Sequence, residues 1–189
     1  MNILARNQRT RSMPSFHRYE KHMPGHHVQI DVKFLAFVDP ERKKLRRFQY
    51  TAIDDATRIG ALKIYRLNTQ KNATDFVDYV VRKFPFRIHT ICTDRGHKFQ
   101  SMFHWHVEDQ GTSHVYIKPR SLRLDGKVER SHGIDEREFY QPIEYKDDVD
   151  LDATLQEWEK FYNLHRPHGA HRGRTPYEAL RDKLECPVS

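Results

Sequence analysis

Apolar and polar residues alternate along the first part of the chain in three runs, which predict three β-strands. The first run covers residues 27–38, the second lies near 47–54, and the third lies near 58–66. A charged turn that begins with Asp39-Pro40 separates the first two runs, and residues 54–57 (Asp-Asp-Ala-Thr) are typical of a turn. Three successive strands with short connections predict an antiparallel meander.

The period then changes to helices that alternate with strands. Apolar residues between 73 and 84 recur at helical spacing until Pro85, and a strand is expected at 88–93. A second helix, with an apolar face between Phe99 and Val107, precedes a fifth strand at 114–117. This order predicts an α/β fold with a mixed five-stranded sheet, whose last two strands are entered by helical crossovers and which helices flank.

Three more helices are expected after the fifth strand. They lie near 125–139, near 150–163, and after Thr175, where Thr175-Pro-Tyr-Glu178 has the order of a capping box. The length of 189 residues suits one domain with short extensions. We therefore expect three parts: a basic N-terminal arm or linker (1–26), a core (27–145) and a C-terminal helical extension of that core (146–189).

Charge is distributed unevenly over these parts. The net charge is +7, with 33 Lys and Arg against 26 Asp and Glu. The arm has five basic residues against one acidic residue and the core has 21 against 16, whereas the extension has seven against nine. The arm and the core would attract a polyanion, and nucleic acid is the commonest one. Charge alone would equally serve solubility.

Several protein classes are disfavoured by composition. The apolar runs are too short to span a bilayer, and the first residues lack a secretory apolar region, so a cytoplasmic protein is expected. Two cysteines, Cys92 and Cys186, provide no disulfide framework, and Cys92 is expected to be a small buried apolar residue. The thirteen histidines lack the paired Cys or His spacing of a structural zinc site.

Three carboxylates fall where a site for two metal ions would need them. Asp31 lies inside the first strand, Asp94 ends the fourth strand, and Glu129 lies in the helix near 125–139. Hard divalent cations prefer oxygen ligands, and an Asp inside an apolar strand is costly without a partner. Each residue alone has a simpler explanation: a solvated strand position for Asp31, a turn for Asp94, and a solvated helix position for Glu129. Their joint placement favours the metal site.

Three other acids compete with this assignment. Asp54 and Asp55 lie at a predicted hairpin, which favours a turn role over metal binding. Asp125 lies four residues before Glu129 and is either a helix cap or an extra carboxylate near the metals.

Basic residues gather around Glu129. They are expected to bind the phosphates that flank a scissile bond, although a solvated basic loop is the alternative. The set is Lys118, Arg120, Arg123, Lys127 and Arg130.

Four sequence motifs together resemble one family. They are Asp31, the segment 93–99 (TDRGHKF), the segment 119–132 (PRSLRLDGKVERSH), and a tail made of 162–168 (YNLHRPH) and 173–180 (GRTPYEAL). These are similar to the retroviral-integrase-type core of bacterial insertion-sequence transposases, which has a ribonuclease H-like fold. The similarity runs from about residue 19 to 184, and the 34 residues between Asp94 and Glu129 are close to the family's interval.

The resemblance implies metal-dependent DNA strand cleavage and strand transfer in transposition. It implies that Asp31, Asp94 and Glu129 are the Asp-Asp-Glu catalytic and metal-binding residues, with two Mg²⁺ or Mn²⁺ ions. The partners would be DNA, as element ends and target, and further copies of the chain in a homo-oligomer. Two alternatives stay open: a catalytically impaired, truncated remnant that acts by DNA binding or oligomerisation, and a ribonuclease H-like nuclease that cuts RNA–DNA hybrids.

The chain departs from the family pattern at four positions, where it has Arg95, Leu122, Asp125 and Gly133. An Asn usually follows the second Asp, so we expect Arg95 to reach Asp94 and compete with cations, rather than to hold phosphate. Family members also usually have an N-terminal helix-turn-helix region, which this chain is expected to lack.

Overall fold

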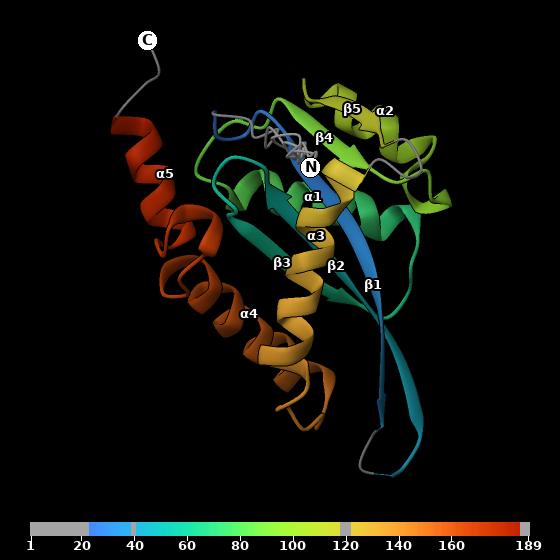
Figure 1. Ribbon diagram of the computed structural model, residues 1–189. Helices are drawn as coiled ribbons and strands as arrows, with labels where there is room; N and C mark the ends of the chain where they lie inside the picture. The colour runs from blue at the N-terminus through green and yellow to red at the C-terminus, as the bar shows by residue number, and fades with distance from the viewer. Residues whose placement is uncertain (1–22, 39–40, 118–121, 186–189) are drawn as a thin grey trace, which may run out of the picture.

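A mixed five-stranded sheet forms the centre of the protein, as expected (Figure 1). The computed structural model describes residues 23–38, 41–117 and 122–185, and only the backbone of 122–126. The strands lie in the order β3-β2-β1-β4-β5; β1 pairs antiparallel with β2 and parallel with β4. They are β1 (Val28–Val38), β2 (Lys44–Asp54), β3 (Gly60–Tyr65), β4 (Thr90–Thr93) and β5 (Ser113–Tyr116).

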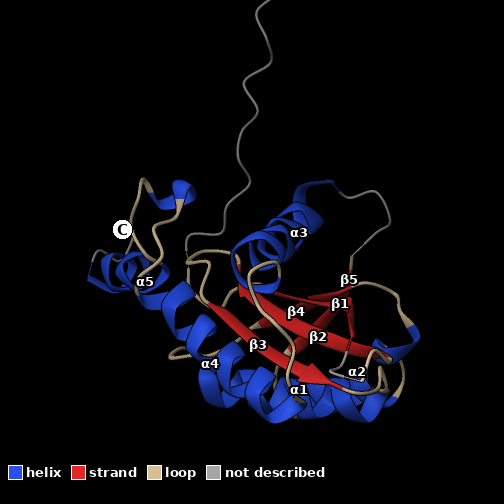
Figure 2. Cartoon of the chain, turned by 90° about the horizontal axis from the view of Figure 1, so that it is seen from below, coloured by secondary structure: helices blue, strands red, loops and turns tan. Residues whose placement is uncertain are grey.

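Helices cover both faces of this sheet. Figure 2 shows α3 on one side and both α1 and α2 on the other. The helices are α1 (Gln70–Lys83), α2 (Met102–Asp109), α3 (Leu122–Asp135), α4 (Asp148–Leu164) and α5 (Pro176–Glu185). Shorter helical turns lie at His97–Phe99, Glu136–Tyr140 and Gly169–His171. No helix within the described ranges is both long and apolar enough to cross a membrane.

Strand alternation divides the core into two clusters. Even-numbered residues such as Ile30 and Ala52 pack with α1 and α2, because successive side chains of a strand point to opposite faces. Odd-numbered residues such as Leu35 and Ile53 pack with α3 and α4. Asp31 is therefore on the face that α3 covers.

A buried polar network fastens α3 to the sheet and to α4. Asp135, at the end of α3, is fully buried, and burial raises the pKa of its carboxyl group. It accepts hydrogen bonds from Gln49 of β2 (2.8 Å) and from the indole of Trp158 in α4 (2.9 Å). Tyr140 donates a further bond to Gln49 (2.5 Å). These bonds satisfy polar groups that would be costly to bury unpaired.

Several element boundaries differ from the expected ones. The strand β2 begins at Lys44, three residues before the expected start, because β1 pairs with it as far as Val38. The helix expected over 125–139 ends as α-helix at Asp135 and continues as a π-helical turn. The capping box is confirmed: Thr175 and Glu178 exchange hydrogen bonds of 2.8 and 3.2 Å.

The end of the predicted N-terminal arm packs on the core, whereas residues 1–22 lie outside the described residues. Gly25 donates its backbone N–H to Asp54 (2.9 Å) and accepts a bond from His89 (2.8 Å). Its φ of +73° and the closeness of the Arg87 carbonyl leave no room for a side chain.

Candidate active site

A pocket of about 200 Å³ opens where β1, β4 and α3 meet. All three predicted carboxylates are part of its wall. The lining residues are Gln29, Ile30, Asp31, Asp94, Ile117, Val128 and Glu129.

Strand register brings Asp31 and Asp94 together. The parallel strands β1 and β4 align Gln29 with Cys92, so two residues further on Asp31 lies beside Asp94. Cys92 is buried, as expected. The last residue of β4 is Thr93, so Asp94 leaves the sheet at the carboxyl end of the strand. Ile117, just after β5, closes this edge by donating its N–H to the Thr93 carbonyl (2.8 Å).

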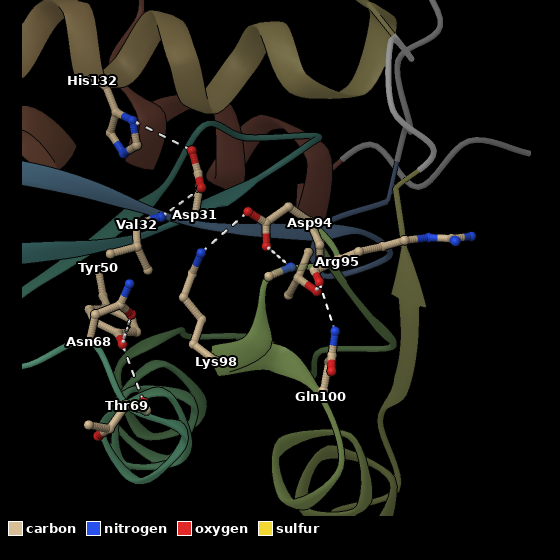
Figure 3. Close-up of polar contacts among 12 residues, drawn as sticks. Asp31, Val32, Tyr50, Asn68, Thr69, Asp94, Arg95, Lys98, Gln100 and His132 are labelled. Atoms are coloured by element: carbon tan, nitrogen blue, oxygen red, sulfur yellow. Dashed lines mark hydrogen bonds and ion pairs between the residues drawn. The ribbon is translucent and has the colours of Figure 1, made fainter.

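Asp31 lies beneath α3 and is partly exposed, at 38% for its side chain. Its Oδ1 accepts the N–H of Val32 (2.7 Å), and its Oδ2 lies 3.8 Å from Nδ1 of His132 (Figure 3). That distance is too long for a hydrogen bond. Burial, together with the nearby Lys33, lowers the pKa of His132 to about 4. The imidazole is therefore neutral at pH 7, and its contact with Asp31 is not an ion pair.

His132 lies beside Lys33, a residue of β1 whose contacts join this strand to α3 and to the turn that follows it. Lys33 donates to the His132 carbonyl (3.3 Å) and forms an ion pair with Glu136. Nε2 of His132 is buried and has no hydrogen-bond partner among the described residues. These contacts hold α3 over Asp31.

Asp94 is held by its own loop. Its Oδ1 accepts the N–H of Gly96 (2.8 Å), and its Oδ2 lies 3.3 Å from Nζ of Lys98 (Figure 3). The Lys98 side chain is only 12% exposed and its ammonium group lies 4.7 Å from the centroid of the Phe99 ring. The expectation for Arg95 was wrong: its exposed side chain points away from the Asp94 carboxylate in Figure 3.

Glu129 reaches the pocket from α3. Its neighbour Val128 is 3% exposed and belongs to the core on this face, which fixes the side of the helix that faces the sheet. Glu129 itself is exposed, and no described side chain forms an ion pair or hydrogen bond with its carboxylate.

Two of the three competing acids, Asp54 and Asp55, make contacts typical of structural residues. Asp54 is fully buried and accepts the N–H and hydroxyl of Thr57 (2.8 and 2.7 Å), as expected for a turn. Asp55 is 1% exposed and forms an ion pair with Lys127 of α3. The Asp125 side chain lies outside the described part of the chain.

The predicted phosphate-binding residues fall into three groups. Lys118 and Arg120 lie outside the described residues, as does the side chain of Arg123. Arg130 is exposed beside Glu129. Lys127 is 14% exposed and engaged with Asp55, a placement that favours a structural role.

The donor set of the pocket suits a hard cation, although its carboxylates are not gathered around one point. Across the described ranges, no three His, Cys, Asp or Glu side chains stand close enough together to hold a metal ion. Asp31 accepts the N–H of Val32, and Asp94 accepts the N–H of Gly96, so each carboxylate contacts a donor of its own segment. Carboxylate oxygens remain the ligands that Mg²⁺ and Mn²⁺ prefer.

Two residues of the site, Lys98 and His132, were missed by the sequence analysis. Lys98 is four residues after Asp94, but that spacing implies contact only in a helix, and the chain there forms a loop and one 3-10 turn. His132 is three residues after Glu129 on α3, so helical spacing could have placed it beside the pocket.

Comparison with known proteins shows which proteins the chain is similar to. The integrase core domain family matches residues 110–176. The ORF3 protein of Spiroplasma virus SpV1-C74, which is provisionally named an integrase, is 26% identical over 171 residues. That alignment covers 81% of this chain and 47% of the viral protein, so the chain spans about half the length of this relative.

Solved structures share the fold. A chain of the simian T-cell lymphotropic virus intasome, solved in complex with the PP2A regulatory subunit B56 gamma, superimposes with a TM-score of 0.75 at 19% identity, covering 94% of this chain and 61% of that one. The HTLV-2 integrase catalytic core domain, solved in complex with magnesium, superimposes with a TM-score of 0.66 at 18% identity. The match covers 84% of this chain and 97% of that one. The chain is therefore similar to the integrase core domain over residues 110–176, and it shares the ribonuclease H-like fold of retroviral integrase catalytic cores.

Proposed function

We propose that the protein is the catalytic core of a transposase or integrase that cleaves DNA strands and joins them to target DNA. The proposal rests on one observation: Asp31, Asp94 and Glu129, from three separate elements, line a single pocket. A nucleic-acid substrate also agrees with the excess of basic residues in the arm and core.

The three carboxylates would hold two Mg²⁺ or Mn²⁺ ions. When bound, such ions activate an attacking oxygen and stabilise the leaving oxygen of a phosphodiester. Asp31 and Asp94 would bind from the sheet, and Glu129 from α3. Because Asp94 is held by Gly96 and Lys98, its carboxylate has to turn away from Lys98 to bind a cation.

Other residues would position the DNA. Arg130 is exposed next to Glu129 and would bind a phosphate near the scissile bond, a contact without sequence information. Lys118, Arg120 and Arg123 remain part of the proposed phosphate-binding set. The relatives with intasome and integrase names support, by analogy, DNA partners and assembly into oligomers.

Strand cleavage and strand joining on duplex DNA, with Mg²⁺ or Mn²⁺ supplied, test the proposal. We expect Asp31→Asn, Asp94→Asn and Glu129→Gln each to abolish metal-dependent cleavage while leaving DNA binding intact. Asp109→Asn is the matched control, because Asp109 is exposed on α2 and lies outside the pocket lining. Its cleavage should equal that of the unmodified chain.

Two results would overturn the proposal. DNA binding without cleavage by the unmodified chain, with either metal, would indicate a catalytically silent remnant. Cleavage of RNA–DNA hybrids in preference to duplex DNA would indicate a ribonuclease H-like nuclease instead.

A further inference from the structure

The β1–β2 hairpin continues beyond the other strands as a two-stranded ribbon (Figure 1). The strand β3 pairs with β2 only from Phe48 to Ile53, and β4 pairs with β1 only at Val28 and Gln29. Leu35–Val38 and Lys44–Arg47 therefore pair with each other alone. A ribbon of two strands is marginally stable in water unless something supports it.

One face of the ribbon has that support. Phe37 stacks on Tyr145, with ring centroids 5.1 Å apart. Arg47 donates two hydrogen bonds, of 2.6 and 2.9 Å, to the carboxylate of Asp148 at the start of α4. Tyr145 donates to the same carboxylate (2.9 Å). These contacts to Tyr145 and to the start of α4 hold the ribbon in a defined position.

The opposite face is exposed and combines apolar with basic side chains. We call it the outer ribbon face. Cross-strand register pairs Phe34 with Phe48, Ala36 with Arg46 and Val38 with Lys44. Phe34 and Val38 are 53% and 56% exposed, and Lys44 and Arg46 are also exposed. These positions alternate with the supported ones, so the outer ribbon face points away from α3 and the carboxylate pocket.

Charge identifies the class of partner. The outer ribbon face has two basic residues, Lys44 and Arg46, and no acidic residue among the described positions. Elsewhere in the described ribbon, Lys43 pairs with Glu41 and Arg47 pairs with Asp148. Two such faces would repel one another, which disfavours a second copy of the chain. A polyanion would be attracted, and a two-stranded ribbon has the width to enter the major groove of duplex DNA.

We propose that the outer ribbon face binds a segment of duplex DNA at a distance from the carboxylate pocket. Lys44 and Arg46 would contact phosphates, and Phe34 and Val38 would contact the apolar edges of sugars and bases. The distance from Asp31 to Val38 along β1 is about 23 Å, so one duplex could engage the pocket while this face holds DNA further away. This inference deepens the proposed function and rests on it for the identity of the polyanion.

Binding of a short duplex of arbitrary sequence to the full chain tests the inference. Fluorescence anisotropy is measured over a salt series with EDTA present, so that cleavage plays no part. For the double variant Lys44→Ser/Arg46→Ser we expect roughly tenfold weaker binding at low salt. The slope of log affinity against log salt should become shallower by about 2, as two phosphate contacts are lost.

Controls separate the face from general charge. Lys71→Ser/Arg181→Ser removes the same charge from exposed positions of α1 and α5 and should change affinity much less. Phe34→Ala should weaken binding without changing the salt slope, because it removes an apolar contact. Circular dichroism and thermal unfolding check that each variant is folded.

Equal losses in the ribbon and control variants would overturn the inference. The inference would also be overturned if Lys44→Ser/Arg46→Ser left duplex binding unchanged and instead weakened binding to anionic vesicles or changed the oligomeric state of the chain. The proposed function fails separately: an unmodified chain without metal-dependent cleavage, but with ribbon-dependent duplex binding, would reject strand transfer and keep this surface. Normal cleavage with ribbon-independent binding would do the reverse.

Discussion

The ammonium group of Lys98 lies 3.3 Å from Oδ2 of Asp94, on the carboxylate that is proposed to bind metal. The side chain of Lys98 is 12% exposed and that of Asp94 is 53% exposed. The ammonium group of Lys98 is therefore shielded from solvent, whereas the carboxylate of Asp94 faces the pocket. Lys98 therefore neutralises Asp94 from the protein side, and a bound cation would have to compete with it.

Lys98→Gln should strengthen metal binding. Removing the competing charge frees one oxygen of Asp94, and a partly exposed ion pair of this kind contributes about 0.2–1 kcal/mol. The Mg²⁺ or Mn²⁺ concentration for half-saturation should fall by a factor of up to about five, as measured by Mn²⁺ electron paramagnetic resonance or by metal-dependent thermal stabilisation. Lys71→Gln, on exposed α1, is the control. Weaker metal binding in Lys98→Gln would show that Lys98 orients Asp94 rather than competing for it.

Arg95→Asn should leave the metal dependence unchanged. The Arg95 side chain points away from the Asp94 carboxylate, so it takes no oxygen from a cation (Figure 3). As an exposed cation beside the pocket it can hold phosphate, and its loss should weaken duplex binding by less than about tenfold. Paired titrations with Mg²⁺ and with DNA distinguish the two effects. If Arg95→Asn changed the Mg²⁺ concentration for half-saturation but not the DNA affinity, the Arg95 side chain would have to act on Asp94 rather than on DNA.

Lys127→Met should destabilise the fold. The partner carboxylate, Asp55, is 1% exposed and would lose its ion pair with Lys127, while the guanidinium of Arg58 lies further away, at 3.8 Å. Breaking a buried ion pair is costly, and we expect a loss of about 2–3 kcal/mol in the free energy of unfolding, measured with urea. Arg130→Met, at an exposed position of α3, should change stability by less than about 0.5 kcal/mol. Equal stability of the two variants would assign Lys127 to DNA binding after all.

Acid should erase the stabilisation by Asp148. Hydrogen bonding to Arg47 is the main cause that lowers the pKa of Asp148 to about 2, below about 3.9 for an unfolded Asp. A lowered pKa gives stability that is present above about pH 3.9 and is lost as the pH falls through about 2. Asp148→Asn should therefore cost about 1–2 kcal/mol near pH 6 and progressively less below pH 4. Glu157→Gln, at an exposed position of α4, is the control, and its effect on the free energy of unfolding should not change in this way with pH.

Local periodicity predicted the order of strands and helices because each depends on near neighbours in the chain. The period-2 run around Asp31 and the helical repeat that ends at Pro85 correspond to β1 and α1. The capping box at Thr175 could be read from four residues, since both of its hydrogen bonds lie within them.

Features that depend on tertiary contact could not be predicted in this way. The contact of Lys127 with Asp55 could not be foreseen, because the two residues are 72 positions apart in the sequence. The approach of His132 to Asp31 likewise depends on how α3 docks on the sheet. Arg95 was expected to reach Asp94, but its side chain points away, and the Asp94 carboxylate accepts the N–H of Gly96 instead (Figure 3).

The buried bonds to Asp135 also determine which way Glu129 faces. The two residues are six positions apart on α3, about 9 Å along its axis. A one-residue slip of the helix would rotate Glu129 by about 100° and break the bonds from Gln49 and Trp158, leaving buried donors unpaired at about 1–3 kcal/mol each. The direction of the Glu129 side chain is therefore fixed by the amide of Gln49 and the indole of Trp158, which do not line the pocket.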